Sequence, residues 1–283
     1  MPANVAEILA AYDAGQSHYR SWRKVPTQTT ASGIWFDLSM SPGNPVPQYY
    51  AAAPLSAIRL ARSTDGGLDH GPAQSGYTKH LHKFLALTTT ATAAPLPMIL
   101  CDYLLYYPFI GMDAGEQSMT NDVALSRYTD GAGVMVMAVE VASQVGGASF
   151  FITYTNSAGV AGRITPTVTC NTQTVNGTII TSAPKTLGTA GPFIPLAHGD
   201  SGVRSIEKIE FLTGDVGLIS LVLVKPLASH SIYDITGPSE SDFLIDKGVL
   251  PTIVDDAYLN MIVHPVGTLA AAPIIGEIQT FWS

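Results

Sequence analysis

The stretch GVMVMAVEVASQVGGASFFITYTN, residues 133–156, decides the fold class of this chain. It contains two runs rich in valine, methionine, phenylalanine and threonine, and the sequence QVGG separates them. Apolar runs of this length, rich in β-branched and aromatic residues and bounded by glycine turns, are typical of β-strands. Residues 133–143 and 149–156 are therefore predicted to be two strands joined by a turn.

The same pattern continues on both sides of this stretch. Turn sequences such as NSAG, VNG and TGDVG recur, and neither a long helical pattern nor a short repeat interrupts the series. Many short strands in succession predict an all-β fold, and we expect an antiparallel β-sandwich, jelly-roll-like, over residues 81–283. Further strands are predicted at residues 32–40, 82–90, 98–109, 162–171, 177–182, 203–212, 217–227, 230–236, 257–265 and 273–282.

Residues 1–80 show a different pattern, which predicts a short N-terminal helix and an extended N-terminal arm. Apolar residues at helical spacing give residues 4–15 one apolar face. Frequent proline and glycine exclude long regular elements from residues 16–80. The apolar and aromatic side chains of this segment need burial, so helix and arm are expected to clamp a neighbouring subunit. The residues predicted to bind a partner are Val5, Ile8, Leu9, Tyr12, Trp22, Trp35, Tyr49 and Tyr50.

The composition limits the classes of partner. The 283 residues are 46% hydrophobic but only 13% charged, which favours burial of surface against other subunits. The net charge is −8 and the basic residues form no stripe, which argues against direct nucleic-acid binding. Arg20, Arg23 and Lys24 are predicted to be solvated loop charges. No apolar run approaches the ~18 to 20 residues of a membrane span, and no signal peptide is visible.

The two cysteines, Cys101 and Cys170, lie inside predicted strands. One disulfide between them is an alternative, but two reduced, buried thiols are favoured. The chain is accordingly expected to fold in a reducing cytoplasm.

The sequence GDSG at residues 199–202 matches the surroundings of the nucleophilic serine in chymotrypsin-like proteases. Such a site also needs a histidine base and an orienting aspartate. Val203 stands where a further glycine is expected, and no matching histidine motif precedes it. We therefore interpret GDSG as a turn, in which Asp200 and Ser201 hydrogen-bond their own backbone and the glycines bend the chain.

Two other patterns could support chemistry. His80 and His82 would share one face of a strand and could meet a metal ion, with His70 or Asp69 as a distant third ligand. Carboxylates cluster at Asp255–Asp256, Asp113–Glu116 and Glu240–Asp242, as a glycosidase would require. A polar strand entrance and solvated loops are the favoured interpretations, and the sequence predicts no catalytic residue, no metal and no cofactor.

Eight segments spread over most of the chain carry a family resemblance. They are AGQSHYRSWRK (14–24), GIWFDLSMSPGNPVPQYYAAAPL (33–55), KHLHKFLAL (79–87), ILCDYLLYYPFIGMD (99–113), LSRYTDGAGVMVMAVEV (125–141), ASFFITYTNSAGVAGR (148–163), GPFIPLAHGDSGVRSIE (191–207) and LVLVKPL (221–227). Together they resemble virion structural proteins of tailed bacteriophages. The resemblance implies a particle component located in the virion and made in the host cytoplasm, and it brings no catalytic residues.

The residues narrow this role. The absence of a long helical pattern disfavours the major capsid shell protein, and the absence of fibrous repeats disfavours a tail fibre. The first hypothesis is a non-enzymatic subunit that decorates and stabilises the capsid. Its expected partners are further copies of itself, with a trimer as one option, and the major capsid protein or other virion proteins.

The alternative is a tail- or adsorption-associated β-sandwich module that binds host glycans. Tyr103, Tyr106, Tyr107 and Phe109 could then form a stacking surface, although a core strand explains the same spacing. A third hypothesis, an enzyme of the glycan-hydrolase or protease class, would rest on the carboxylate pairs or on Ser201.

Overall fold

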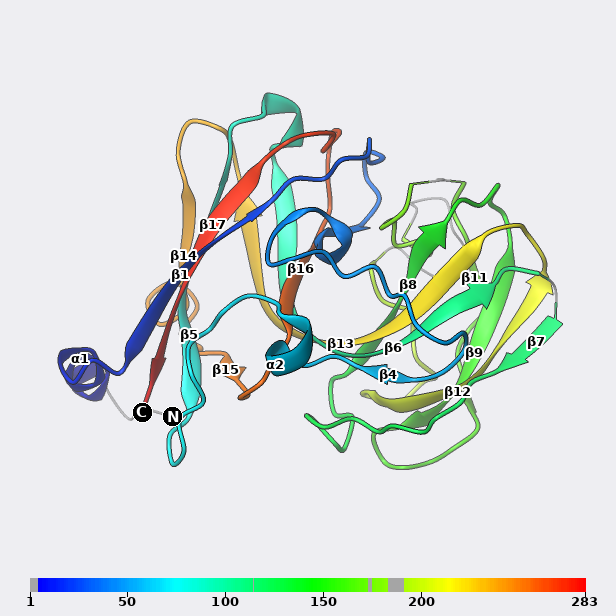
Figure 1. The fold of residues 1–283 in the computed structure, drawn as a ribbon, viewed down its shortest axis with the longest axis horizontal. Coiled ribbons are helices and arrows are strands. Elements are labelled where there is room, and N and C mark those ends of the chain that lie inside the picture. Colours follow the sequence, from blue (N-terminus) through cyan, green and yellow to red (C-terminus); the bar gives the residue numbers. More distant parts are fainter. Residues whose placement is uncertain (1–4, 114, 173–174, 183–190) are drawn as a thin grey trace.

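The chain folds mainly into antiparallel β-strands (Figure 1). The structure is a computed structural model, and it describes residues 5–113, 115–172, 175–182 and 191–283. Within these residues the strands form three sheets, one more than the two sheets of a jelly roll. The predicted all-β antiparallel sandwich is confirmed, because apolar strand faces from different sheets pack against one another.

Sheet A has the strand order β14-β5-β17-β1-β3, and β15 also pairs with β5. Strand β1 pairs along all its 8 residues with β17, so the predicted units 1–80 and 81–283 contribute strands to one sheet. The strands are Ser17–Lys24 (β1), Gly43–Asn44 (β3), Lys79–Thr88 (β5), Ser239–Asp242 (β14), Thr252–Ile253 (β15) and Ile274–Trp282 (β17).

Sheet B has the order β2-β16-β6-β13-β8, and β4 also pairs with β6. Its strands are Phe36–Asp37 (β2), Ile58–Arg59 (β4), Leu96–Gly111 (β6), Met135–Ala142 (β8), Leu218–Ile232 (β13) and Leu259–Val263 (β16). Strands β6 and β13 have 16 and 15 residues, and they are long enough to pack first against sheet A and then against sheet C.

Sheet C has the order β10-β9-β12-β7, and β11 also pairs with β9. Its strands are Gly115–Ser118 (β7), Ser149–Asn156 (β9), Arg163–Ile164 (β10), Val168–Thr169 (β11) and Val203–Thr213 (β12). The helices are α1 (Val5–Asp13) and α2 (Arg62–Asp65), with short 3-10 turns at Leu38–Met40 and Ala91–Ala93. Helix α1 confirms the helix predicted at residues 4–15, of which residue 4 lies outside the described residues.

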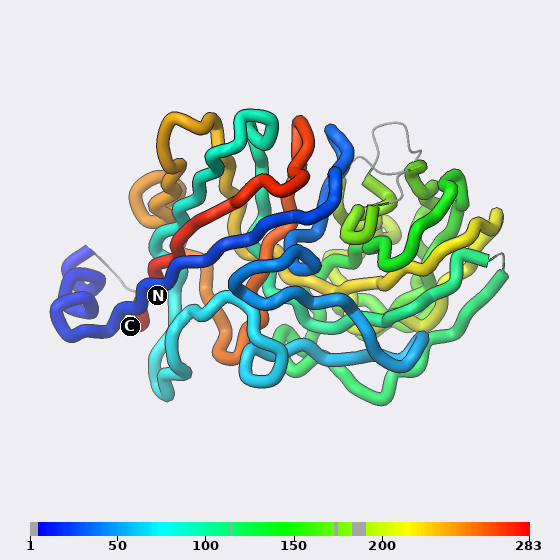
Figure 2. The backbone as a smooth tube through the Cα atoms, turned by 45° about the horizontal axis from the view of Figure 1, so that its top comes forward, coloured from blue at the N-terminus to red at the C-terminus, as the bar shows by residue number. Residues whose placement is uncertain are grey.

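Sheet B carries apolar side chains that pack in two directions. Leu96, Met98 and Leu100 of β6 pack in one core with sheet A, while Leu105 and Tyr107 pack in a second core with sheet C. The tube in Figure 2 shows the two resulting halves side by side, with α1 projecting at the end of the sheet A half.

A third core contains side chains of β6 that alternate with those facing sheet A. Cys101 and Tyr103 pack there with Tyr50 and Leu60, which come from the segment predicted to be an arm. That segment is largely extended, as predicted, but it lies on the sheets of its own chain. When an extended segment is buried, its backbone N–H and C=O groups need hydrogen-bond partners. Strands of the same chain provide these partners here.

A buried ion pair lies where the two main cores meet on β6. The Arg127 guanidinium donates to both carboxylate oxygens of Asp102, at 2.9 and 2.8 Å, and also to the carbonyl oxygens of Leu60 and Tyr103. Burial raises the pKa of Asp102, while Arg127 acts in the opposite direction. Because both partners are almost completely buried, the removal of either one would leave an uncompensated charge in the core.

Two sequence expectations about single residues have opposite outcomes. Cys101 and Cys170 are free, buried thiols, as predicted. The solvated position predicted for Lys24 is wrong, because its ammonium group is buried and donates to the carbonyl oxygens of Ser39 and Ser41, at 3.3 and 3.0 Å. Burial lowers the pKa of Lys24 to about 8.

Candidate functional site

Helix α1 carries apolar side chains on two sides, and only one side packs on the rest of the chain. Ile8 and Ala11 are buried in or against the sheet A core. Val5 and Leu9 point outward, with exposed fractions of 57% and 60%. The single apolar face predicted for this helix is therefore split between a side that packs on sheet A and a side that faces solvent.

His82 of β5 connects α1 to the loop that follows β14. Its Nδ1 atom is hydrogen-bonded to the Tyr12 hydroxyl, and its Nε2 atom lies 3.6 Å from an oxygen of Asp242. Burial lowers the pKa of His82, with the nearby Asp242 acting in the opposite direction. In the neutral ring a proton on Nε2 faces this carboxylate and leaves Nδ1 as the acceptor for Tyr12. The contact places α1 next to residues 243–251.

The loop at residues 243–251 lies at the same end of the molecule as α1 (Figures 1 and 2). It exposes further apolar side chains. Ile245 and Val249 are 79% and 62% exposed. We call Val5, Leu9, Ile245 and Val249 together the terminal face. An open groove of about 210 Å³ adjoins it, and its lining includes Leu227, Ala228, Phe243, Lys247, Val249 and Pro251.

Two of the aromatic residues predicted to bind a partner are inside the chain. Trp22 is 2% exposed and its ring packs on Phe84, with ring centroids 5.8 Å apart. Tyr50 is fully buried and donates a hydrogen bond to Asp37, as Tyr103 does. The expectation that Trp22 and Tyr50 contact a neighbour is corrected, because both side chains are already enclosed by strands of their own chain.

Two further aromatic residues of that prediction, Trp35 and Tyr49, lie nearer the surface. Trp35 is partly buried and its ring lies 5.1 Å from that of His264. Tyr49 is 55% exposed and borders a pocket of about 100 Å³ that Phe36 and Met40 also line. The structure thus separates these two residues from the terminal face.

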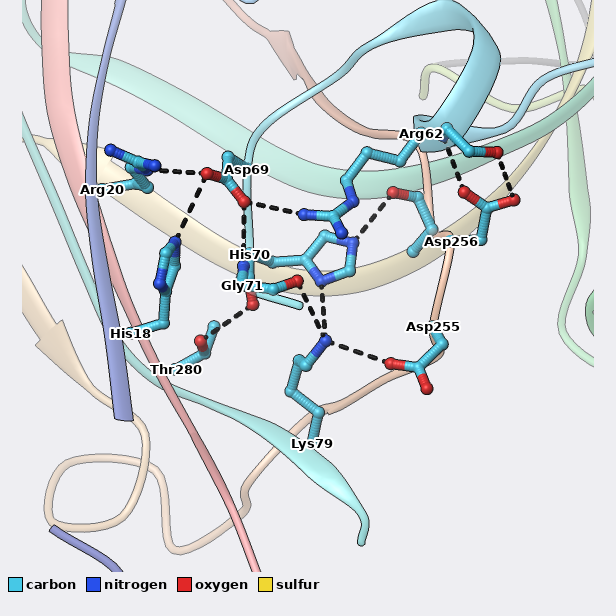
Figure 3. Close-up of polar contacts among 12 residues, drawn as sticks. His18, Arg20, Arg62, Asp69, His70, Gly71, Lys79, Asp255, Asp256 and Thr280 are labelled. Carbon is cyan, nitrogen blue, oxygen red and sulfur yellow. Dashed lines mark hydrogen bonds and ion pairs between the residues drawn. The ribbon is translucent and has the colours of Figure 1, made fainter. Parts of the chain in front are cut away.

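A polar cluster is centred on Asp69, which precedes β5 (Figure 3). Its carboxylate accepts hydrogen bonds from Arg20 Nε at 2.6 Å, Arg62 Nη1 at 2.7 Å and the Gly71 backbone at 3.0 Å. His18 Nε2 lies 3.4 Å away. Partial burial acts to raise the pKa of Asp69, but these hydrogen bonds together lower it to about 2. The carboxylate is therefore a fixed anion that holds three separate segments together.

The neighbouring His70 and Lys79 continue this cluster into the interior. His70 Nε2 donates to the carbonyl oxygen of Ala257 at 3.1 Å, and Nδ1 accepts from Lys79 Nζ at 3.3 Å. Lys79 also donates to Asp255 at 3.1 Å. Burial lowers the pKa of His70 to about 3 and also lowers that of Lys79. Because both side chains are almost fully buried, the cluster joins β5 to its neighbouring loops and offers no accessible base.

A surface depression of about 250 Å³ lies beside Asp69, with Arg20 and Asn44 among its lining residues. Its charged groups already bond to each other. No local pattern in the sequence indicated this cluster, beyond the suggestion of His70 or Asp69 as a distant metal ligand. Its members come from β1, α2, β5 and the loop before β16, and no spacing rule connects residues so far apart.

The GDSG sequence is a connection into β12 whose aspartate bonds to a neighbouring strand. Asp200 accepts from Tyr154 Oη at 2.6 Å, Asn156 Nδ2 at 2.7 Å and Arg163 Nε at 2.8 Å. The hydrogen bond from Tyr154, followed by that from Arg163, lowers the pKa of Asp200 to about 2. The Asp200 backbone N–H donates to the carbonyl oxygen of Ala197 at 3.0 Å, within the turn as predicted. The carboxylate instead bonds outside the turn, to side chains of β9 and β10.

Ser201 and Gly202 also have structural positions. The Ser201 hydroxyl lies 3.2 Å from that of Ser157. A Cβ atom at Gly202 would stand 2.0 Å from the carbonyl oxygen of Gly131 and 2.7 Å from the Gly133 nitrogen. Glycine at position 202 is therefore required by close backbone contact, which no turn rule in the sequence revealed.

The histidines and carboxylates considered as possible metal ligands or catalytic pairs make separate contacts within the fold. His80 packs its ring on Phe281, and the carboxylates Asp255, Glu240 and Glu116 pair with lysines. The described ranges contain no group of three or more His, Cys, Asp or Glu side chains placed to hold a metal ion. These side chains connect strands and loops rather than converge on a common point.

The aromatic run on β6 belongs to the interior. Tyr103, Tyr106 and Tyr107 are at most 4% exposed. Tyr107 donates to Asn121 at 2.7 Å and Tyr103 donates to Asp37 at 2.7 Å. The stacking surface suggested for these residues is therefore not at the surface of the chain.

Comparison with known proteins adds little to this geometry. No protein-family model matches the chain, and no curated protein matches it. One weak structural match is the structure of infectious bursal disease virus Gt strain, with 8% identity and a TM-score of 0.17 over 94% of this chain and 81% of that chain. A TM-score this low carries no argument about fold or function. In the part of the chain described, no helix is both long and apolar enough to cross a membrane.

Proposed function

We propose that this chain is a non-enzymatic structural subunit of a tailed-bacteriophage virion, and that it acts by contact with other subunits. The observation that carries the proposal is the terminal face, where Val5, Leu9, Ile245 and Val249 are each more than half exposed. Apolar side chains gathered at one end of a protein mark an interaction surface. The phage virion as its setting rests on the sequence resemblance described above.

The hydrogen bonding and burial of the charged side chains support a role in subunit contact rather than catalysis. Asp69, Asp102 and Asp200 each accept several hydrogen bonds from their own chain, and the buried Lys79 does not face solvent. A catalytic acid, base or nucleophile needs access to a substrate. These groups instead join segments that lie far apart in the sequence, as expected of a rigid building block.

Capsid decoration is the role we propose within the virion. A compact double sandwich with a projecting helix suits a subunit that sits on a preformed lattice and contacts the major capsid protein or other virion proteins. The glycan-binding alternative loses its supporting surface, because the tyrosines of β6 are buried. We therefore do not propose it as a second function.

Location of the protein in purified particles tests this proposal. Labelled antibodies against the chain, combined with cryo-EM of the same particles, should place it on the capsid surface in many copies. Placement on the tail would overturn the decoration role, and absence from particles would overturn the virion role. A Ser201→Ala variant tests the enzyme hypothesis separately, because a hydrolytic activity that this change abolishes would contradict a non-enzymatic subunit.

A further inference from the structure

We propose that helix α1 of one copy docks in the groove beside residues 243–251 of a second copy, so that two copies exchange helices. This inference rests on the proposed function, because it names the partner and the contact through which the structural subunit would act. It uses the outward side of α1 together with a largely apolar groove beside residues 243–251. Helix α1 and the loop at residues 243–251 lie at the same end of the molecule (Figures 1 and 2).

The outward side of α1 presents two apolar side chains and one charge in a row. Val5, Leu9 and Asp13 are spaced four residues apart, so they line one side of the helix. All three are exposed, whereas Ile8 and Ala11 face the sheet. A helix of 9 residues is marginal by itself, and contact on only one side leaves it weakly held. A second contact along the Val5–Leu9 row would bury the apolar surface that remains.

The groove has the size and lining to accept such a row. Its volume of about 210 Å³ exceeds the ~150 Å³ of a cavity that admits a benzene-sized apolar molecule. Leu227, Phe243, Val249 and Pro251 provide apolar walls. It is open to solvent along one side, which a helix side chain needs for entry. Leu9 is the side chain we expect at its centre.

Charge complementarity favours α1 as the occupant. Asp13 ends α1 at the negative pole of the helix dipole, and the last turn contains no basic residue. An anion at this position is unfavourable unless a cation is nearby. Lys247 lines the groove, and among the described side chains it forms no salt bridge. Docking of Val5 and Leu9 in the groove would bring Asp13 of one copy toward Lys247 of the other.

The position of helix and groove permits a closed dimer. Both belong to one end of the molecule, because His82 connects Tyr12 of α1 to Asp242 at the start of the loop. In two copies related by a twofold axis, α1 of each copy can then enter the groove of the other. Both copies use the same surface, so the contact is isologous and forms a closed dimer. The small area of two helix contacts implies a weak dimer, with a dissociation constant in about the micromolar range.

Sedimentation equilibrium of the full chain tests this inference. The unchanged protein should dimerise, and Leu9→Asp should raise the dissociation constant at least about tenfold, because a carboxylate replaces a buried leucine. Val160→Asp is the matched control, since Val160 is 51% exposed on a loop of the sheet C half. It should leave the dimer unchanged. Circular dichroism and thermal unfolding of each variant confirm that the fold is kept.

A charge exchange tests the pairing of Asp13 with Lys247. Asp13→Lys and Lys247→Asp should each weaken the dimer several-fold, and the double variant should recover most of the loss. A monomeric unchanged protein, an unaltered dimer in Leu9→Asp, or a double variant without recovery would each overturn the inference. Location in virions is measured independently, so particles containing a chain that does not dimerise would refute this contact and leave the structural role intact.

Discussion

Helix α1 and strand β1 follow each other in the sequence, yet they relate to the rest of the chain in opposite ways. Strand β1 pairs with β17 along its length and directs Trp22 and Lys24 into the interior. Helix α1 contacts sheet A through one side and leaves Val5 and Leu9 in solvent. Both segments were predicted to clamp a neighbouring subunit, but of the two only the helix leaves aliphatic side chains exposed for such a contact.

The difference follows from how each element satisfies its backbone. A strand needs another strand to pair its N–H and C=O groups, and here its own chain provides β17. A helix forms those hydrogen bonds internally, so only its side chains decide where it packs. A terminal strand is therefore bound into the fold, whereas a terminal helix can keep one face for another molecule.

The largest expected effect is the difference in stability lost when Trp22 of β1 and Leu9 of α1 are each replaced by alanine. Trp22→Ala should lower the free energy of unfolding by about 3–5 kcal/mol, because it leaves a cavity between β1 and Phe84. Leu9→Ala should change it by less than about 0.5 kcal/mol, since Leu9 is largely exposed. Urea unfolding followed by fluorescence and circular dichroism measures both. Equal losses in the two variants would break the comparison.

A smaller effect is expected at Gly276, which lies opposite Trp22 on β17. A Cβ atom there would stand 2.3 Å from Cζ2 of Trp22 and 2.3 Å from the carbonyl oxygen of Leu85. Gly276→Ala should therefore destabilise the chain by about 1–3 kcal/mol through overpacking. Gly237→Ala is the control, because that position has open space around it. A Gly276→Ala variant as stable as the control would show that β1 is packed loosely.

The smallest effect concerns pH and the docking of α1. Burial lowers the pKa of His82 below its usual value near 6.5, so the docked helix favours the neutral ring. This contribution is complete above pH 6.5 and is lost as the pH falls below it. Hydrogen exchange of the α1 amides, corrected for intrinsic rates, should thus become faster on acidification.

The comparison with β1 provides the control for this pH effect. Exchange of the Trp22, Arg23 and Lys24 amides, corrected in the same way, should not change over this pH interval. This end of β1 does not hydrogen-bond to the His82 ring, and it is the end away from His18. His82→Gln keeps polar atoms beside Tyr12 and Asp242 but does not titrate. An α1 response that persists in His82→Gln would assign the effect to another group.

The sequence predicted strands best where apolar residues dominate them. Residues 149–156 are observed as β9 with the predicted bounds, and residues 203–212 differ from β12 by one residue. Strand β1 was missed because the three cations of SHYRSWRK resemble a solvated loop. Lys24 in fact points inward, where its ammonium group donates to buried carbonyl oxygens. Local pattern cannot reveal a buried lysine whose partners lie about 15 residues away.

The terminal face was predictable only in part. The spacing of Val5, Ile8, Leu9 and Tyr12 correctly indicated a helix, but not which of these side chains would face the sheet. Ala11 is buried beside Ile8, and the sequence prediction did not include it because alanine carries little hydrophobic signal. His82 links Tyr12 of α1 to Asp242, which precedes the loop at residues 243–251. Its contact with Tyr12 spans 70 residues of sequence, and no motif describes it.

Concentration-dependent hydrogen exchange tests the central claim most directly, namely that β1 is internal and α1 is available to a second molecule. Amides of β1 should exchange slowly and at the same rate at low and high protein concentration. Amides of α1 and of residues 243–251 should become more protected as the concentration rises through the micromolar range. Unchanged exchange in α1, or increased protection elsewhere instead, would contradict this account.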